Sequence, residues 1–161
     1  MIDGTKTAGE LRIALVVSMY HDFVTDRLQA GALAALAAAQ VANDHITVVR
    51  VPGAFEIPIT ARLVAERGQC DAVVCLGCLI RGETPHFDYI AQAAAHGIMR
   101  AAQTTGVPMA FGVLTTNTVD EALARSAAGP ANKGREAAVA AVSMVRLYTR
   151  FGARGAEWDG A

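Results

Sequence analysis

Short apolar runs alternate along the chain with longer segments of helical periodicity. Four runs of seven or eight residues, rich in Val, Ile, Leu and Cys, span residues 12–18, 45–51, 73–80 and 108–114. Runs of this length predict buried β-strands. Each is followed by a segment in which apolar residues recur every three or four positions, and this spacing predicts a helix. The repeated strand–helix order predicts an α/β fold, a three-layer sandwich in which helices flank a four-stranded parallel sheet.

Capping residues predict where the helices begin. Asp22 precedes the first helix, and Asn132 precedes the last. Thr84 and Pro85 offer an N-cap hydroxyl followed by a proline at the first helical position, and Thr118 starts a capping box with the glutamate three residues later. In the helix that begins near Pro58, the side chains expected to face the core are Ile59, Leu63 and Val64.

Composition narrows the class of protein. The 161 residues are 53% hydrophobic and carry a net charge of −1, with both signs interspersed, which argues against a nucleic-acid or membrane-surface role. No apolar run reaches 18 residues, and the N-terminus lacks the layout of a signal peptide. We therefore expect a cytoplasmic protein with one domain over residues 1–161 and flexible ends at 1–11 and 152–161.

Cys75 and Cys78 form a C-x-x-C motif, which invites a redox or metal interpretation. The motif lies inside a predicted strand, where residues three apart point to opposite faces. No second Cys or His pair follows at zinc spacing. Buried, unreactive thiols are therefore the favoured interpretation, and no metal site is expected.

The turns after the four strands carry the candidate chemistry, because they meet at the carboxyl edge of a parallel sheet, where α/β folds bind ligands. Tyr20 and Phe55 could stack on a flat heterocycle, and Glu56 could accept hydrogen bonds from hydroxyl groups. Glu83–Thr84, at a helix start, could hold a phosphate, and His86 could transfer a proton. Each also has a plainer interpretation, as a core ring, a charge favourable to a helix dipole, or a surface histidine. The remaining histidines, expected to be structural or solvated, are His21, His45 and His96.

Arg125 lies ten residues beyond the fourth strand, on the short helix. It would then be roughly 12–15 Å along the helix from the sheet edge. We therefore do not expect it to reach the site of its own subunit.

Four segments, in order, resemble the lumazine synthase (6,7-dimethyl-8-ribityllumazine synthase) family: Val51–Pro58, Leu79–Tyr89, Gly112–Thr116 and Asn132–Gly134. The resemblance runs from about Ile13 to Phe151. It implies a flavodoxin-like sandwich and an enzyme of the penultimate step of riboflavin synthesis. That enzyme joins 5-amino-6-(D-ribitylamino)uracil to 3,4-dihydroxy-2-butanone 4-phosphate by imine formation, loss of phosphate and ring closure. No cofactor is implied.

The same resemblance implies roles for single residues. The residues implied to bind the pyrimidine and its ribityl chain are Tyr20, Ala54, Phe55, Glu56, Cys78, Leu79 and Ile80. Glu83 and Thr84 would bind the phosphate, and His86 would transfer protons. Phe111 and Arg125 would come from a neighbouring subunit, with Lys133 as a further interface residue.

Sharing of a site between subunits implies a ring. In the resembled family this ring is a pentamer, and some members stack twelve pentamers into a sixty-subunit shell; riboflavin synthase is a further implied partner. The linker over 126–134 carries no insertion, which permits the shell. This chain has Met19-Tyr20-His21 where the family usually carries Arg-Phe-Asn, and tyrosine can still stack. A non-catalytic flavin or lumazine binder, or a shell protein, stays open as an alternative, although the acid–base set favours an enzyme.

Overall fold

A computed structural model describes residues 6–151. Four parallel strands form one sheet in the order β2-β1-β3-β4. The strands are β1 (Ile13–Ser18), β2 (Ile46–Val51), β3 (Ala72–Ile80) and β4 (Met109–Thr116). The order agrees with the flavodoxin-like arrangement, in which the chain winds outward from β1 in both directions. The predicted α/β fold is confirmed.

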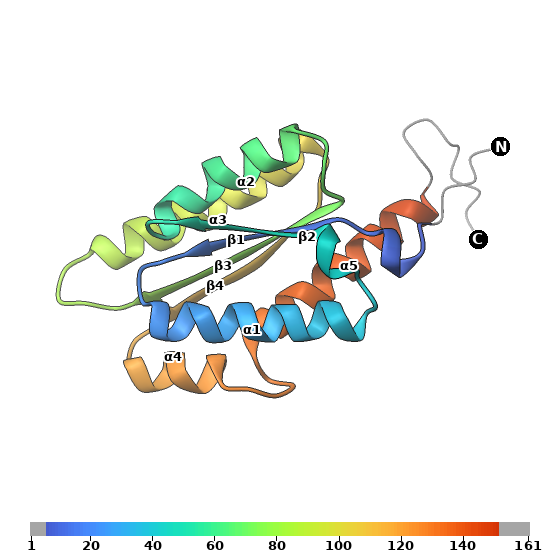
Figure 1. The fold of residues 1–161 in the computed structure, drawn as a ribbon. Coiled ribbons are helices and arrows are strands. Elements are labelled where there is room, and N and C mark those ends of the chain that lie inside the picture. Colours follow the sequence, from blue (N-terminus) through green and yellow to red (C-terminus); the bar gives the residue numbers. More distant parts are fainter. Residues whose placement is uncertain (1–5, 152–161) are drawn as a thin grey trace.

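Helices cover both faces of the sheet (Figure 1). On one face lie α1 (Asp22–Ala38), α4 (Val119–Ser126) and α5 (Lys133–Arg150); on the other lie α2 (Ile57–Glu66) and α3 (His86–Thr105). Short 3₁₀ turns occur at η1 (Ala8–Glu10), η2 (Asn43–His45) and η3 (Ala54–Glu56). The central strands β1 and β3 alternate their side chains between two buried clusters, one under each helical layer.

The buried faces of the helices match the sequence in α5 but not in α2. In α5 the apolar residues that recur at helical spacing in the sequence are all buried: Ala138, Ala141, Val142 and Val145. In α2 the prediction was wrong for Ile59 and Leu63, which are 58% and 55% exposed, whereas Val64 is half-buried and packs against the core. The buried residues of α2 are Ile57, Ala61 and Ala65. Small residues allow α2 to lie close to α3, where a side chain at Gly97 would collide with Pro58.

Two of the four predicted caps are present. The side chains of Thr118 and Asn132 accept hydrogen bonds from Glu121 N and Arg135 N. The caps at Asp22 and Thr84 were wrong. The residue at the N-cap of α1 is His21, in the left-handed conformation, and the residue at the N-cap of α3 is Pro85; neither makes a side-chain cap hydrogen bond.

The N-terminal segment contacts the rest of the domain over the part that the structure describes. Lys6 pairs with Asp71 at 2.6 Å, η1 carries a capping box from Thr7 to Glu10, and Leu11 is buried in the core. The flexibility expected of residues 1–11 stays a prediction. Residues 1–5 and 152–161, where flexible ends were predicted, lie outside the described range.

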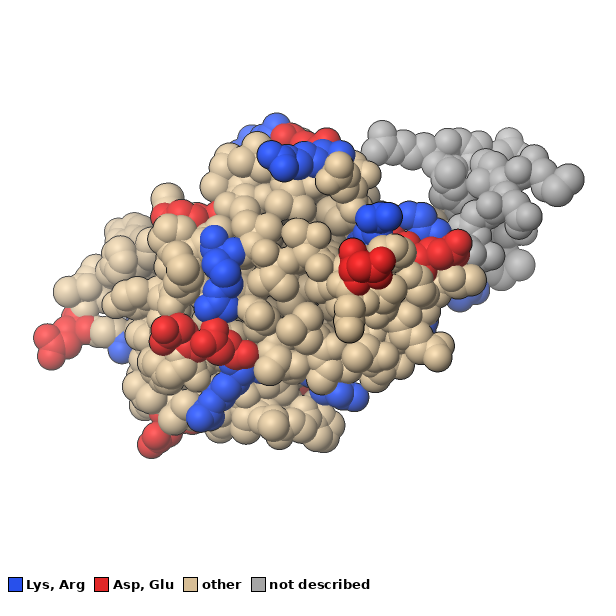
Figure 2. All heavy atoms as spheres, viewed as in Figure 1, with Lys and Arg blue, Asp and Glu red and all other residues tan. Residues whose placement is uncertain are grey.

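Charge is sparse and mixed on the face drawn in Figure 2, where small groups of basic and acidic side chains are separated by wide uncharged areas. Among the described residues, none of the helices is both long and apolar enough to cross a bilayer. Several large apolar side chains are instead exposed singly over the helices and β4, among them Tyr89, Met99 and Phe111.

Candidate active site

The main cleft lies at the carboxyl edge of the sheet and has a volume of about 750 Å³. It is built from the turns after β1, β2 and β3, as the strand order predicts. Its lining includes eight of the predicted site residues: Tyr20, Ala54, Phe55, Glu56, Leu79, Ile80, Thr84 and His86.

Two exposed aromatic rings mark one end of the cleft. Tyr20 is 66% exposed and Phe55 is 59% exposed, so neither ring is the core residue of the plainer interpretation. The turn after β1 is tied to the turn after β2, because Tyr20 N donates to the Pro52 carbonyl at 3.1 Å. Rings held in solvent at the rim of a cleft can stack on a flat ligand.

The turn after β2 supplies a free carboxylate. Gly53 begins the 3₁₀ turn η3, whose hydrogen bond from Glu56 N to Gly53 O is 3.3 Å long. Ala54 is buried beneath the cleft, and Glu56 is half-buried on its wall. The Glu56 carboxylate accepts no hydrogen bond from the residues that the structure describes, so both oxygens are available to ligand hydroxyls.

The turn after β3 presents unpaired backbone donors. Because α3 begins at His86, one residue later than predicted, the N–H groups of Thr84, His86 and Phe87 find no acceptor among residues 6–151. His86 is exposed on the first turn of α3 and lines the cleft. Free N–H groups at the positive end of a helix favour an anion, which is the chemistry expected of a phosphate seat.

Arg81 holds the turn after β3 in place through its side-chain contacts, and the sequence did not predict this role. Its guanidinium donates to Asn117 Oδ1 at 3.1 Å and to both carboxylate oxygens of Asp88, at 3.3 and 3.2 Å. The same group lies 4.5 Å from the centre of the Phe87 ring. The two-pronged pairing and the ring contact together restrict the start of α3 relative to the end of β4.

Two residues predicted to serve the site of their own subunit, Cys78 and Glu83, do not line the cleft. The Cys78 side chain is 1% exposed and packs in the cluster under α1 and α5, while Cys75 packs in the opposite cluster. The prediction that the two thiols point to opposite faces is thus confirmed, and burial raises the pKa of Cys75 to about 12 and that of Cys78 to about 11. Glu83 is exposed outside the lining, so only its backbone lies near the phosphate seat.

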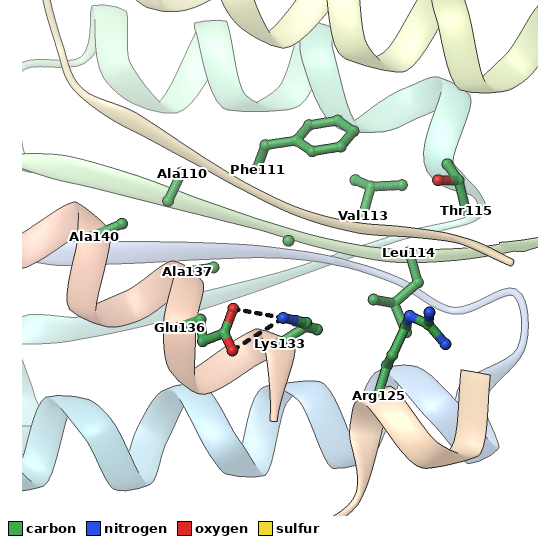
Figure 3. A pocket seen from close by; sticks show the side chains of 11 residues that line it. Ala110, Phe111, Val113, Leu114, Thr115, Arg125, Lys133, Glu136, Ala137 and Ala140 are labelled. Carbon is green, nitrogen blue, oxygen red and sulfur yellow. Dashed lines mark hydrogen bonds and ion pairs between the residues drawn. The ribbon is translucent and has the colours of Figure 1, made fainter. Parts of the chain in front are cut away.

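Phe111, Arg125 and Lys133 line a second groove, along the edge strand β4. In Figure 3 Arg125 and Lys133 lie on the α4–α5 side of β4, whereas the Phe111 ring points to the other side of the strand. This groove has a volume of about 400 Å³. Arg125 donates to the Glu121 carbonyl at 3.2 Å, and Lys133 pairs with Glu136 at 2.8 Å. Arg125 does not line the main cleft, in agreement with the distance argued from its position on the helix.

Several residues that line the main cleft were not predicted from the sequence: His21, Phe87, Ile90 and Val119. His21 was assigned a structural or solvated position, yet it lines the cleft beside Tyr20. Its adjacency to Tyr20 was the one available signal. The other two histidines of that group, His45 and His96, lie outside the lining.

A parallel sheet with a cleft at its carboxyl edge has the features of a flavodoxin-like α/β enzyme. The exposed aromatic rings, free N–H groups and histidine of this cleft could hold a flat ring and an anion and transfer a proton. Comparison with known proteins is more specific. The family model described as 6,7-dimethyl-8-ribityllumazine synthase matches residues 10–149. The chain is also 44% identical over 151 residues to the 6,7-dimethyl-8-ribityllumazine synthase of Desulfatibacillum aliphaticivorans, a match that covers 94% of this chain and 97% of that protein. The chain therefore belongs to the 6,7-dimethyl-8-ribityllumazine synthase family, and it is a transferase with that activity.

Proposed function

We propose that the main cleft binds 5-amino-6-(D-ribitylamino)uracil beside 3,4-dihydroxy-2-butanone 4-phosphate and joins them in the cytoplasm. The observation that carries this proposal is the gathering, in one cleft, of Tyr20, Glu56, Thr84 and His86 from three separate turns. These two substrates require an aromatic ring on which the pyrimidine stacks, a carboxylate that accepts from hydroxyl groups, a phosphate-binding site and a group that transfers protons.

The pyrimidine substrate occupies the aromatic end. Its ring stacks on Tyr20, and its ribityl chain extends along Ala54, Phe55 and Glu56, whose carboxylate accepts from the hydroxyls. Backbone groups of residues 78–80, at the carboxyl end of β3, contact the polar edge of the pyrimidine. This is the one way in which Cys78 can take part, because its side chain is buried on the other side of the strand.

The phosphorylated ketone occupies the start of α3. The backbone N–H groups of Glu83, Thr84, His86 and Phe87 and the Thr84 hydroxyl hold the phosphate, and Arg125 of the neighbouring subunit completes the seat. In the reaction the substrate amine attacks the ketone, and loss of water gives an imine. Proton removal then expels inorganic phosphate, and ring closure releases a second water. His86 carries the protons, while most of the rate enhancement comes from holding the two substrates together.

His86→Ala tests the proton-transfer role. It should lower kcat about 10- to 10³-fold, as loss of general acid–base help does, while binding of the pyrimidine persists. His96→Ala is the matched control, because His96 is exposed on the same helix outside the cleft. An unchanged kcat in His86→Ala would remove the role.

The assembly we propose is a ring of five subunits, able to form a sixty-subunit shell. It is supported by the position of Phe111, Arg125 and Lys133 in a groove apart from the main cleft. Five subunits of 16.8 kDa give 84 kDa, and sixty give about 1 MDa, so light scattering separates the two. An active monomer would overturn the shared site.

Mixed rings test the shared site more sharply. Arg125→Ala should raise KM for the phosphorylated ketone far more than for the pyrimidine. When Arg125→Ala and His86→Ala subunits are unfolded and reassembled together, about a quarter of the sites pair an intact His86 with a neighbour's intact Arg125. Activity should then return to about a quarter of the wild-type level, whereas sites contained in single subunits would show no recovery.

A further inference from the structure

His21 occupies an unusual position in the main cleft. Its ring centre lies 4.5 Å from that of Tyr20 and 5.7 Å from that of Phe23, and both pairs meet edge-on, at interplanar angles of 63° and 83°. Tyr20 is two-thirds exposed, and His21 is the aromatic ring that contacts it among the described residues. The platform proposed for the pyrimidine is therefore supported from one side by the imidazole, which is itself supported by Phe23.

The backbone fixes where the imidazole lies. His21 has φ 59° and ψ 49°, a left-handed conformation that few residues other than Gly, Asn, Asp and His adopt. Its carbonyl accepts hydrogen bonds from Val24 N at 2.9 Å and Thr25 N at 3.0 Å, which start α1. The side-chain direction of His21 is thus set by the first turn of a helix that is packed into the core.

The imidazole does not act as a charged group in this position. Partial burial lowers the pKa of His21, which favours the neutral ring at neutral pH. Neither ring nitrogen has a hydrogen-bond partner among residues 6–151. Among the described residues, the imidazole makes edge-on contacts with the two neighbouring rings. Such aromatic pairs add interaction free energy beyond that of the area they bury.

We propose that His21 is a positioning residue: its ring holds Tyr20 in the orientation in which Tyr20 stacks on the heterocyclic substrate. The inference rests on the proposed function of Tyr20. Without the imidazole the exposed Tyr20 ring is free to rotate, and binding of the heterocycle has to restrict it again. His21 therefore contributes to affinity for the heterocycle and leaves the chemical step and the phosphorylated substrate unaffected.

The test compares His21→Asn with the wild type. Asparagine tolerates the left-handed backbone but removes the ring. The probe is 6,7-dimethyl-8-ribityllumazine, whose binding is followed by fluorescence. We expect its Kd, and KM for the pyrimidine, to rise about 2- to 10-fold, the size of a lost aromatic pair, with kcat and KM for the phosphorylated ketone unchanged. His21→Gly should give the same change, and His96→Asn should give none.

A double-mutant cycle with Tyr20 separates the alternatives. If His21 acts through Tyr20, adding His21→Asn to Tyr20→Ala weakens binding no further. A further loss of affinity in that background would make His21 a direct ligand contact, and a lower kcat would make it a proton carrier; either result overturns the proposal. If Tyr20→Ala weakens binding and both His21 variants do not, this inference fails while the proposed function stands. If Tyr20→Ala itself leaves affinity unchanged, the stacking platform fails as well.

Discussion

Asn132 joins three helices through one buried side chain, and its replacement should be among the most destabilising single changes in the protein. It is 1% exposed. Its amide nitrogen donates to the carbonyls of Ser126, at 2.8 Å, and Arg27, at 3.2 Å, and its amide oxygen accepts from Arg135 N at 3.0 Å. Asn132 thereby ties the end of α4 and the middle of α1 to the start of α5.

The cost of Asn132→Ala follows from these bonds. Loss of the N-cap destabilises a protein by about 1 kcal/mol, and each buried carbonyl left without its donor adds about 1 kcal/mol or more. The free energy of unfolding should therefore fall by about 2–4 kcal/mol, and the melting temperature by roughly 5–15 °C for a chain of this size. Asn132→Ser keeps a capping oxygen but loses the two amide bonds, so it should recover about 1 kcal/mol.

The assay is thermal and urea unfolding at one fixed protein concentration, because self-association raises apparent stability. Asn43→Ala is the matched control: Asn43 is exposed, and its side chain bonds to nothing in the described chain, so the change should stay within about 0.5 kcal/mol. An Asn132→Ala protein as stable as the Asn43→Ala protein would refute the reasoning.

Two further outcomes follow from the packing. Gly134→Ala should destabilise the protein by about 1–3 kcal/mol, because a Cβ at Gly134 would lie 2.8 Å from the Leu28 Cα in the backbone of α1, whereas Gly82→Ala, with nothing within 4 Å, should be nearly neutral in urea unfolding. At pH 8 iodoacetamide should modify the native protein at most slowly and only at Cys70, because Cys75 and Cys78 are buried and their thiols stay protonated. Mass spectrometry checks this, and rapid alkylation of Cys75 would contradict the packing described.

The sequence predicts the fold well because its strongest pattern has one physical solution. The runs that became β1 and β3 are apolar at nearly every position, so both of their faces have to be covered, and helices on both sides of a parallel sheet do this. The buried stripe of α5 was equally readable, because Ala138, Ala141, Val142 and Val145 recur at helical spacing on an otherwise polar helix.

The errors arise where packing or backbone geometry overrides residue type. Ile59 and Leu63 are large apolar residues of α2, yet α2 packs into the core through Ile57, Ala61 and Ala65. At Thr84 a hydroxyl precedes a proline, the usual sign of a cap, but Pro85 has ψ near 2° and the helix starts one residue later. The position of His21 in the cleft was not predicted, because hydrophobic periodicity does not indicate the direction in which a turn leads the chain. A residue in the left-handed conformation changes that direction.

The two grooves lie apart on one subunit, so a single subunit does not bring all the proposed site residues together. In the proposed shared site, Thr84 and His86 supply one part, at the start of α3. The cation that the resemblance assigns to it, Arg125, lines the other groove, as does Phe111 on the edge strand β4. Phe111 is 47% exposed, and burial of such a ring is favourable by about 1.5–3 kcal/mol. A surface that leaves both an aromatic ring and an arginine open at the edge of the sheet is suited to cover the main cleft of a second copy. Since the two grooves are on different parts of one subunit, this contact is head-to-tail, and head-to-tail contacts that close form rings. The proposed contact between the two grooves therefore favours a ring over a face-to-face dimer, which agrees with the assembly proposed above.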